Sequence, residues 1–473
     1  MEQTNFSNGV PLALSHALMK IQGTSVSTFA VQPISGSQSV NSGGQIRIQV
    51  PSNILFDAKT SKLTFSVETS ADTSSRIPNG VKTLFERCSI TSGGVSIYQG
   101  NNFFGIQEYA RSIMENKPYN KNSDHGFMAV VSDSQGKALT AGDSESYATG
   151  LGKGTMFSVD LGEFANVCPR ILDTSLMPQL EITFYLAPNA VLSAPKSVTQ
   201  QGLTDGFNKV ATAGGQTFSI TNAMFMCNAY ALADGMYSLA MADKIADLGY
   251  LEIMYPQTLA FPQAWSGSAR LSVGCASLNK LSACFRPNTF ANKSAPIPIV
   301  GSPFVSADGA TADTDHPAYA YDGAEFVKGA GVSEYQSAFQ QLKSPITSVT
   351  GDYSDVATQV MLQWSVNSSN VPAYQANVCQ WKDLTAWANN VDDLSVKSLP
   401  EYLNNKFVIS YPFNLPQPPW QKPTISGLDT RSSNSYIELK GTNTLTSGFD
   451  VLVLAETSSI LRVGAGRAIE VIN

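Results

Sequence analysis

The sequence predicts an all-β protein made of two consecutive β-sandwiches, and three observations support that fold class. The chain has 473 residues, more than the roughly 250–300 at which a single hydrophobic core stops growing, so at least two domains are expected. Hydrophobic residues make up 43% of the sequence, which is enough to fill two cores. Segments in which apolar and polar residues alternate recur along the chain, whereas strands do not alternate with helices as they do in α/β folds.

The first sandwich is expected over residues 43–232, after an N-terminal arm of residues 1–42 whose end is rich in Ser, Gly and Gln. Alternation with a period of two residues marks its strands, beginning with Ile46, Ile48 and Val50. The pattern returns in Leu63–Val67, Phe157–Leu161 and Ile182–Leu186, and the apolar segment Phe218–Leu232 is expected to close the sandwich.

One helix is expected in this half, with Asn102 as its N-cap. Its apolar residues share one helical face, and they are Phe103, Ile106, Ala110, Ile113 and Met114. We expect this helix to cover one sheet as a flap.

A second helix, in a linker of residues 233–249, is expected to divide the two sandwiches. Asp234 is its candidate N-cap, Met241, Ile245 and Leu248 form an apolar stripe, and Gly249 is expected to end it.

The second sandwich, residues 250–473, repeats the strand pattern in Leu251–Ile253, Leu271–Val273, Phe407–Ile409, Tyr436–Leu439 and Val451–Leu454. The last of these is apolar enough for burial on both faces. Gly301–Gly331 has no periodicity and is expected to be a loop.

Composition narrows the function classes. Charged residues make up 14% of the chain, against about 25% in an average soluble protein, and a neutral polar surface suits packing against copies of the same chain. The net charge of −7 and the lack of a basic run argue against direct nucleic-acid binding. The sequence starts without a signal-peptide pattern, and no segment approaches the ~20 apolar residues of a membrane span.

The six cysteines lack CxxC spacing, and we expect free thiols in a reducing cytoplasm rather than a disulfide framework. They are Cys88, Cys168, Cys227, Cys275, Cys284 and Cys379.

Two glycine-rich segments invite a nucleotide-binding interpretation, and both fail it. Gly150–Thr155 lacks the four-residue spacing of a phosphate-binding loop, and a strand follows it where a helix would be needed. Val463–Arg467 is followed by six residues, too few for the helix that would hold a pyrophosphate. We expect Gly464 and Gly466 to bend the chain into its final strand.

We predict no catalytic, cofactor-binding or metal-binding residues. His16, His125 and His316 have no second ligand at metal-binding spacing. The pairs Asp392–Asp393 and Asp313–Asp315 could bind a hard cation, but solvated loop carboxylates are the favoured interpretation. The aromatic and proline-rich segment Tyr411–Trp420 could bind a partner or a sugar, and a rigid loop at a subunit contact is favoured.

Three segments resemble parts of the double jelly-roll major capsid proteins of polinton-like viruses, virophages and nucleocytoplasmic large DNA viruses. Ala455–Ile472 is similar to the closing strand pair of the second roll, Pro178–Asn189 to a late strand of the first, and Cys275–Lys280 to an early segment of the second. The resemblance implies two consecutive jelly rolls and no enzymatic activity or cofactor. It also implies a homotrimeric capsomer with a pseudo-hexagonal outline that tiles an icosahedral virion shell.

The expected partners are therefore other copies of the chain, together with penton and minor capsid proteins, and the expected location is the virion after synthesis in the host cytoplasm. Two alternatives remain open at this point. One is an extracellular carbohydrate-binding or adhesin-like β-sandwich protein, which the Ser, Thr and Asn content also fits. The other is a hydrolase whose Ser, His and Asp residues come together only in the folded chain.

Overall fold

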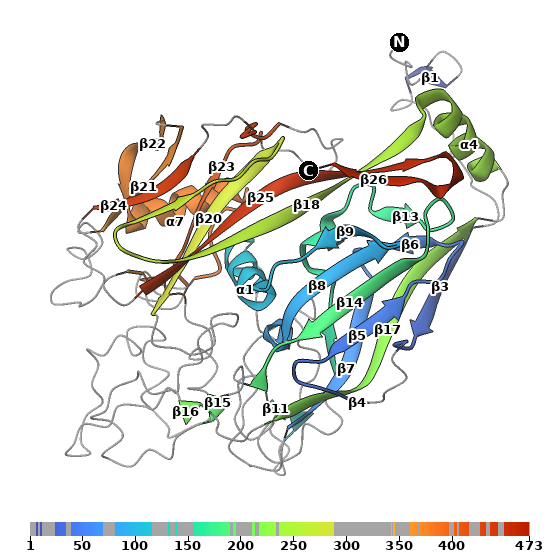
Figure 1. Ribbon diagram of the computed structural model, residues 1–473, viewed down its shortest axis with the longest axis horizontal. Coiled ribbons are helices and arrows are strands. Elements are labelled where there is room, and N and C mark those ends of the chain that lie inside the picture. Colours follow the sequence, from blue (N-terminus) through green and yellow to red (C-terminus); the bar gives the residue numbers. More distant parts are fainter. Residues whose placement is uncertain are drawn as a thin grey trace.

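The computed structural model describes twelve main ranges of the chain, with a few shorter pieces between them. These ranges are 24–34, 39–69, 81–115, 156–189, 217–232, 236–287, 360–367, 369–396, 406–415, 426–431, 436–442 and 449–472. They form two β-sandwiches joined by helix α4 (Met236–Leu248) (Figure 1).

The first sandwich consists of two antiparallel sheets. One sheet contains β3 (Thr24–Val31), β4 (Ser39–Asn41), β6 (Leu55–Asp57), β7 (Lys62–Thr69), β12 (Met156–Val159), β13 (Ile171–Asp173) and β17 (Phe218–Leu232). The other contains β5 (Gln45–Gln49), β8 (Phe85–Ser92), β9 (Val95–Gln99) and β14 (Leu180–Leu186). In the first sheet β17 pairs with β7 along one edge and with β3 and β4 along the other, and β12 follows β7; the second sheet has the order β5–β14–β8–β9.

The second sandwich also has two antiparallel sheets. One contains β18 (Tyr250–Ala264), β20 (Leu278–Pro287), β23 (Val408–Pro412), β25 (Phe449–Gly464) and β26 (Ile469–Ile472). The other contains β19 (Ser268–Leu271), β21 (Met361–Val366), β22 (Ser369–Asn377) and β24 (Ile437–Thr442). Their orders are β18–β25–β20–β23, with β26 paired to β25, and β19–β24–β21–β22.

The two sandwiches share one topology. The strands of each sandwich can be numbered from 1 to 8 along the chain, with β3 and β4 taken together and with β6, β13 and β26 left out. In both sandwiches strands 1, 8, 3 and 6 then form one sheet, and strands 2, 7, 4 and 5 form the other. This is the arrangement of a jelly roll, two Greek keys folded into paired four-stranded sheets. The predicted fold class, a double jelly roll, is confirmed.

Alternation in the sequence corresponds to burial in the strands. In β5, Ile46 and Ile48 are fully buried while Gln45, Arg47 and Gln49 are exposed. At Val451–Leu454 in β25 all four side chains are buried, as predicted for a strand that is covered on both faces.

Helices occupy matching places in the two rolls. In each roll one helix follows the fifth strand, α1 (Phe104–Met114) after β9 and α7 (Val378–Ala388) after β22. Asn377 caps α7, because its side chain accepts a hydrogen bond from the Gln380 N–H while Gln380 caps in return.

The predictions for α1 were wrong in two respects. The N-cap is Phe103, and it is Asn101, not Asn102, whose side chain accepts the Phe103 N–H. The helix is also no flap with one covered face, because every residue of α1 except Arg111 is buried.

Helix α4 ends where predicted. Gly249 has φ +79 and its N–H donates to the carbonyl of Ile245 at 2.8 Å. The predicted apolar stripe is not fully covered, because Leu248 is 64% exposed. The candidate N-cap Asp234 lies outside the described residues.

Strands also occur within the predicted N-terminal arm. β3 and β4 pair with β17, so the chain joins the first sheet well before residue 43. Three separate two-stranded sheets consist of two-residue strands: β1 (Phe6–Ser7) with β2 (Val10–Pro11), β10 (Val131–Ser132) with β11 (Ala138–Leu139), and β15 (Ser193–Ala194) with β16 (Ala211–Thr212). The segment Gly301–Gly331 lies outside the described residues.

All six cysteines are free, as predicted, and four of them are buried. Among the helices that the structure describes, none has the length and apolar character of a membrane span.

Candidate functional site

The structure describes only some of the residues considered as sites from the sequence. His16, His125, His316, the pair Asp313–Asp315 and the segment Gly150–Thr155 lie outside the described residues. Asp392 is exposed, and Asp393 pairs with Lys382, with 2.6 Å between Nζ and Oδ1. Within the described part of the chain, no three side chains of His, Cys, Asp or Glu are placed to hold a metal ion.

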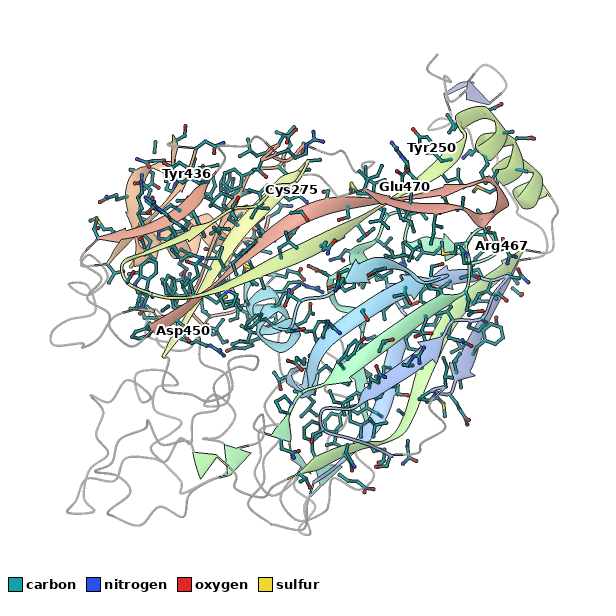
Figure 2. The ribbon with its side chains drawn as sticks, in the orientation of Figure 1. Tyr250, Cys275, Tyr436, Asp450, Arg467 and Glu470 are labelled. Atoms are coloured by element: carbon teal, nitrogen blue, oxygen red, sulfur yellow. The ribbon has the colours of Figure 1, made fainter. Side chains whose placement is uncertain are left out.

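The glycine segment near the C-terminus forms a hairpin. β25 and β26 pair antiparallel from Ile460 with Ile472 to Val463 with Ile469. Gly466 and Arg467 both have positive φ at the turn, while Gly464 is extended. In Figure 2 Arg467 lies at the turn of this hairpin, beside the first roll, and Asp450 lies at the far end of the long strand β25, in the second roll.

The most elaborate side-chain arrangement lies where the two rolls meet. The hydrophobic core of the first roll includes residues from both ends of the second, namely Ile253, Tyr255, Leu461 and Val463. The core of the second roll in turn includes the α1 residues Ile106, Tyr109, Ala110, Ile113 and Met114. Each roll therefore completes the core of the other.

Hydrogen bonds cross the same junction. The backbones of Cys168 and Met254 exchange two hydrogen bonds, at 2.7 and 2.8 Å. The Tyr255 hydroxyl donates to the carbonyl of Ile97, and the Asn101 side-chain amide donates to the carbonyl of Thr258 at 3.1 Å. These bonds fix the start of β18 against the first roll.

A buried ionic network supports the junction from the first-roll side. Lys82 Nζ lies 2.7 Å from Glu108 Oε2 and 2.6 Å from Asp160 Oδ1. Glu108 also pairs with Arg111 at 3.0 Å, and that arginine continues to Glu115 at 3.1 Å. The side chains of Lys82, Glu108 and Asp160 are each exposed by less than a tenth, so the pairing offsets a large desolvation cost.

Opposite charges in this network favour the ionised forms of Asp160 and Lys82. Burial alone would raise the pKa of Asp160, but the neighbouring Lys82 and Arg111 bring that pKa below its ordinary value. Burial would likewise lower the pKa of Lys82, and the carboxylates of Asp160 and Glu108 raise it instead.

Glu163 is another buried carboxyl at the junction. Among the residues that the structure describes, no Lys or Arg forms an ion pair with it. Its carboxylate accepts hydrogen bonds from the Tyr98 hydroxyl at 2.9 Å, the Thr258 N–H at 2.8 Å and the Thr258 hydroxyl at 2.5 Å. Burial raises the pKa of Glu163 to about 7, against these three hydrogen bonds, and the charge of Glu456 adds to the rise.

A small cleft opens beside Glu163. It has a volume of about 120 Å³ and its lining includes Arg111, Glu115, Lys280 and Glu456. Thr258 and Lys280 flank Glu456 on the neighbouring strands, and Lys280 Nζ lies 2.9 Å from Glu456 Oε2.

A buried carboxyl with a pKa near 7 in a cleft is a candidate acid or base, but the surroundings favour a structural role. The cleft is smaller than the roughly 300–1,000 Å³ of ordinary ligand pockets. The donors to Glu163 come from both rolls, since Tyr98 belongs to β9 and Thr258 to β18. The buried carboxylate of Glu163 thus links the two rolls by accepting hydrogen bonds from both.

The aromatic segment predicted at Tyr411–Trp420 is described as far as Leu415. Tyr411 and Phe413 pack edge to face with ring centroids 5.6 Å apart, and Tyr411 packs in the same way against Trp387 of α7 at 6.0 Å. Trp387 is 58% exposed and Leu415 is 67% exposed, so the cluster is a surface feature of the second roll.

The sequence did not indicate the junction residues. Lys82 is 26 residues from Glu108 and 78 from Asp160, and no local motif links them. Their one signal is charge within apolar segments of a chain that has few charges, for example Glu108 between Ile106 and Ala110.

Comparison with solved structures matches this chain to viral capsid proteins along nearly its whole length. The VP54 protein of PBCV-1, fitted into a reconstruction of the virophage Sputnik, superposes with a TM-score of 0.57 at 12% identity, covering 98% of this chain and 99% of that one. A capsid protein from the quasi-atomic model of the PBCV-1 capsid gives 0.57 at 13% identity, with the same coverage. The Faustovirus major capsid protein gives 0.55 at 10% identity, covering 96% of this chain and 93% of its own. No protein-family model and no curated protein matches the sequence.

Proposed function

We propose, with the double jelly-roll fold as the premise, that the protein is the major capsid protein of an icosahedral virus. The observation that carries the proposal is that the likeness to capsid proteins covers 98% of the chain. It is supported by two rolls whose separate cores each contain residues of the other roll. A fold-level likeness is an analogy for function, and the composition and the junction give it independent support.

The mechanism we propose is assembly. Two topologically equivalent rolls side by side give each subunit two lobes, so three subunits around a threefold axis give six lobes with a pseudo-hexagonal outline. Such capsomers tile a surface, and a different protein is needed at the fivefold vertices. We further propose minor capsid proteins as partners, location in the virion and synthesis in the host cytoplasm.

The junction is the part of the subunit that this mechanism most depends on. A hexagonal outline requires the two lobes to keep one fixed relation, because a hinge between them would spoil the contacts with every neighbour. Three features oppose such a hinge. Each core contains residues of the other roll, the backbones of Cys168 and Met254 are hydrogen-bonded, and Glu163 accepts hydrogen bonds from both rolls. We propose that the protein has no enzymatic activity and that this junction has a structural purpose.

The adhesin alternative gains little from the surface aromatic cluster. Sugars stack on flat aromatic faces, and these three rings do not form one flat platform, because Tyr411 is tilted by 66° to Trp387 and by 62° to Phe413. We therefore do not advance it as a second function.

Purified protein tests the proposal. Sedimentation at high concentration is expected to give a trimer, and negative-stain microscopy is expected to show particles with a hexagonal outline. A monodisperse monomer at high concentration would contradict the proposal.

A further inference from the structure

One sheet edge of the first roll lacks the features that normally prevent strands from pairing with other chains. β3 has eight residues and pairs with β17 from Val31–Phe225 to Thr24–Leu232. Among the described residues, no strand pairs with the opposite edge of β3. Half of its backbone N–H and C=O groups point away from β17 at this edge, where another extended chain could form hydrogen bonds with them.

The equivalent strand of the second roll shows what is missing. β18 is the first strand of its roll, as β3 is, and it also lies at the edge of its sheet. It carries Glu252, Pro256 and Pro262, and charges and prolines are the usual means of blocking an edge. β3, with the sequence TSVSTFAV, has no charge and no proline.

The side chains of β3 are unusually apolar for their exposure. Val26 is 72% exposed and Phe29 is 40% exposed. The register places Val26 opposite Tyr230 and Ala30 opposite Met226, so Val26, Ala30 and Met226 share the outer face, and Met226 is 42% exposed. Thr28 lies between Val26 and Ala30 on this face and donates to the Asn228 side chain, so a strand added at this edge would extend a face that is uncharged and partly apolar.

We propose that β3 is a docking edge for a second copy of this protein, which adds its own β3 as an antiparallel strand. The edge is complementary to itself, because an antiparallel pair of uncharged strands opposes no like charges. The resulting contact is twofold and isologous, and it rests on the proposed function because neighbouring capsomers are the copies that can meet in this way.

The size of the edge sets its strength. Stable interfaces involve about 20–30 residues on each side, and β3 supplies eight. A single β3 contact is therefore weak, and it contributes to a shell through the number of such contacts that form together.

The first test compares two lysine substitutions in full-length protein. Val26→Lys places a charge on the β3 edge, and Leu248→Lys is its matched control because Leu248 is similarly exposed, at 64%, on helix α4. Both variants are expected to form trimers with unchanged melting temperature. Val26→Lys is expected to need at least about tenfold more protein than wild type to form particles, as measured by light scattering and microscopy, since like charges would meet at the twofold contact.

The second test does not depend on how Val26→Lys folds. Symmetric antiparallel pairing places one residue of β3, on one face or the other, directly opposite its own copy. A series of single cysteine variants at successive positions from Ser25 to Ala30 is therefore expected to yield a disulfide-linked dimer at one of them. Tyr374→Cys, on edge strand β22 and 50% exposed, and the wild-type chain are the controls.

The two failures can be told apart. If wild-type protein forms neither trimers nor particles, the capsid function is wrong. If wild-type particles form, Val26→Lys assembles like Leu248→Lys, and no cysteine variant links above the controls, then the docking edge is wrong and the capsid function stands.

Discussion

Replacing Glu163 with Gln is expected to stabilise the protein at alkaline pH and to leave it nearly unchanged in acid. The pKa of this carboxyl is raised from an ordinary 4.5 to about 7 by burial at the junction. The folded protein therefore binds more protons than the unfolded chain between these two values, and the contribution of Glu163 to stability falls as the pH rises through that window. Above pH 7 the folded protein carries the full cost of a buried charge.

The magnitude follows from the size of the shift. Each pKa unit corresponds to 1.36 kcal/mol, so a rise from 4.5 to about 7 destabilises the ionised form by about 3 kcal/mol at most. The glutamine side chain of the variant would resemble the neutral carboxyl. Its oxygen can accept from the Tyr98 hydroxyl and the Thr258 N–H, and its amide can donate to the Thr258 hydroxyl once that hydroxyl rotates.

Urea unfolding of Glu163→Gln and wild type at pH 5, 6, 7 and 8 measures the effect. The advantage of the variant is expected to grow from below 1 kcal/mol at pH 5 to about 2–3 kcal/mol at pH 8. Glu181→Gln, which removes an exposed partner of Arg47, is the control and is expected to change stability by under about 1 kcal/mol. An advantage that stays constant from pH 5 to pH 8 would refute the reasoning, because Glu163 would then not titrate in this range.

Two further predictions concern packing around the same junction. Lys82→Met is expected to cost about 3–5 kcal/mol in urea unfolding, since it leaves the buried Asp160 without its ion-pair partner and Glu108 with Arg111 alone; a loss below 1 kcal/mol would mean that the network contributes little. Gly162→Ala is expected to cost about 2–4 kcal/mol, because Gly162 has φ +64 and a Cβ there would lie 2.7 Å from Phe104. Gly94→Ala, with φ +85 and open space around it, isolates the backbone cost at about 1–2 kcal/mol, and equal losses at the two glycines would show that Phe104 yields without cost.

The parts of the fold that the sequence predicted are those where one face of a strand is buried and the other is wet. β5 is the clearest case, because Ile46 and Ile48 alternate with polar residues that do face solvent. The fully apolar segment in β25 was equally informative, since burial on both faces leaves no polar positions. In both cases the apolar or polar character of each residue is enough to predict its burial, without knowing which residues it contacts.

Prediction failed where burial depends on distant partners or where a strand has no buried face. Gln107 and Glu108 lie outside the apolar face predicted for α1, yet both are buried. Their side-chain oxygens accept hydrogen bonds from Asn101 and Lys82, which makes that burial possible. The small and polar residues of β3 gave no alternation because the described positions of this edge strand are largely exposed on both faces. The division at residues 42, 232 and 249 stays a proposal, with β3 and β4 placing part of the first segment in the sheet.

The sharing of core residues limits how the chain can be cut. A fragment ending near residue 232 would leave the first core without Tyr255 and Leu461, and a fragment starting near residue 250 would leave the second core without Ile113 of α1. Each fragment would expose an apolar surface that the intact chain covers. We therefore expect the two rolls to fold as one cooperative unit. A ribosome must release the chain through Ala455 before the second core can be finished, and through Val463 before the first can be.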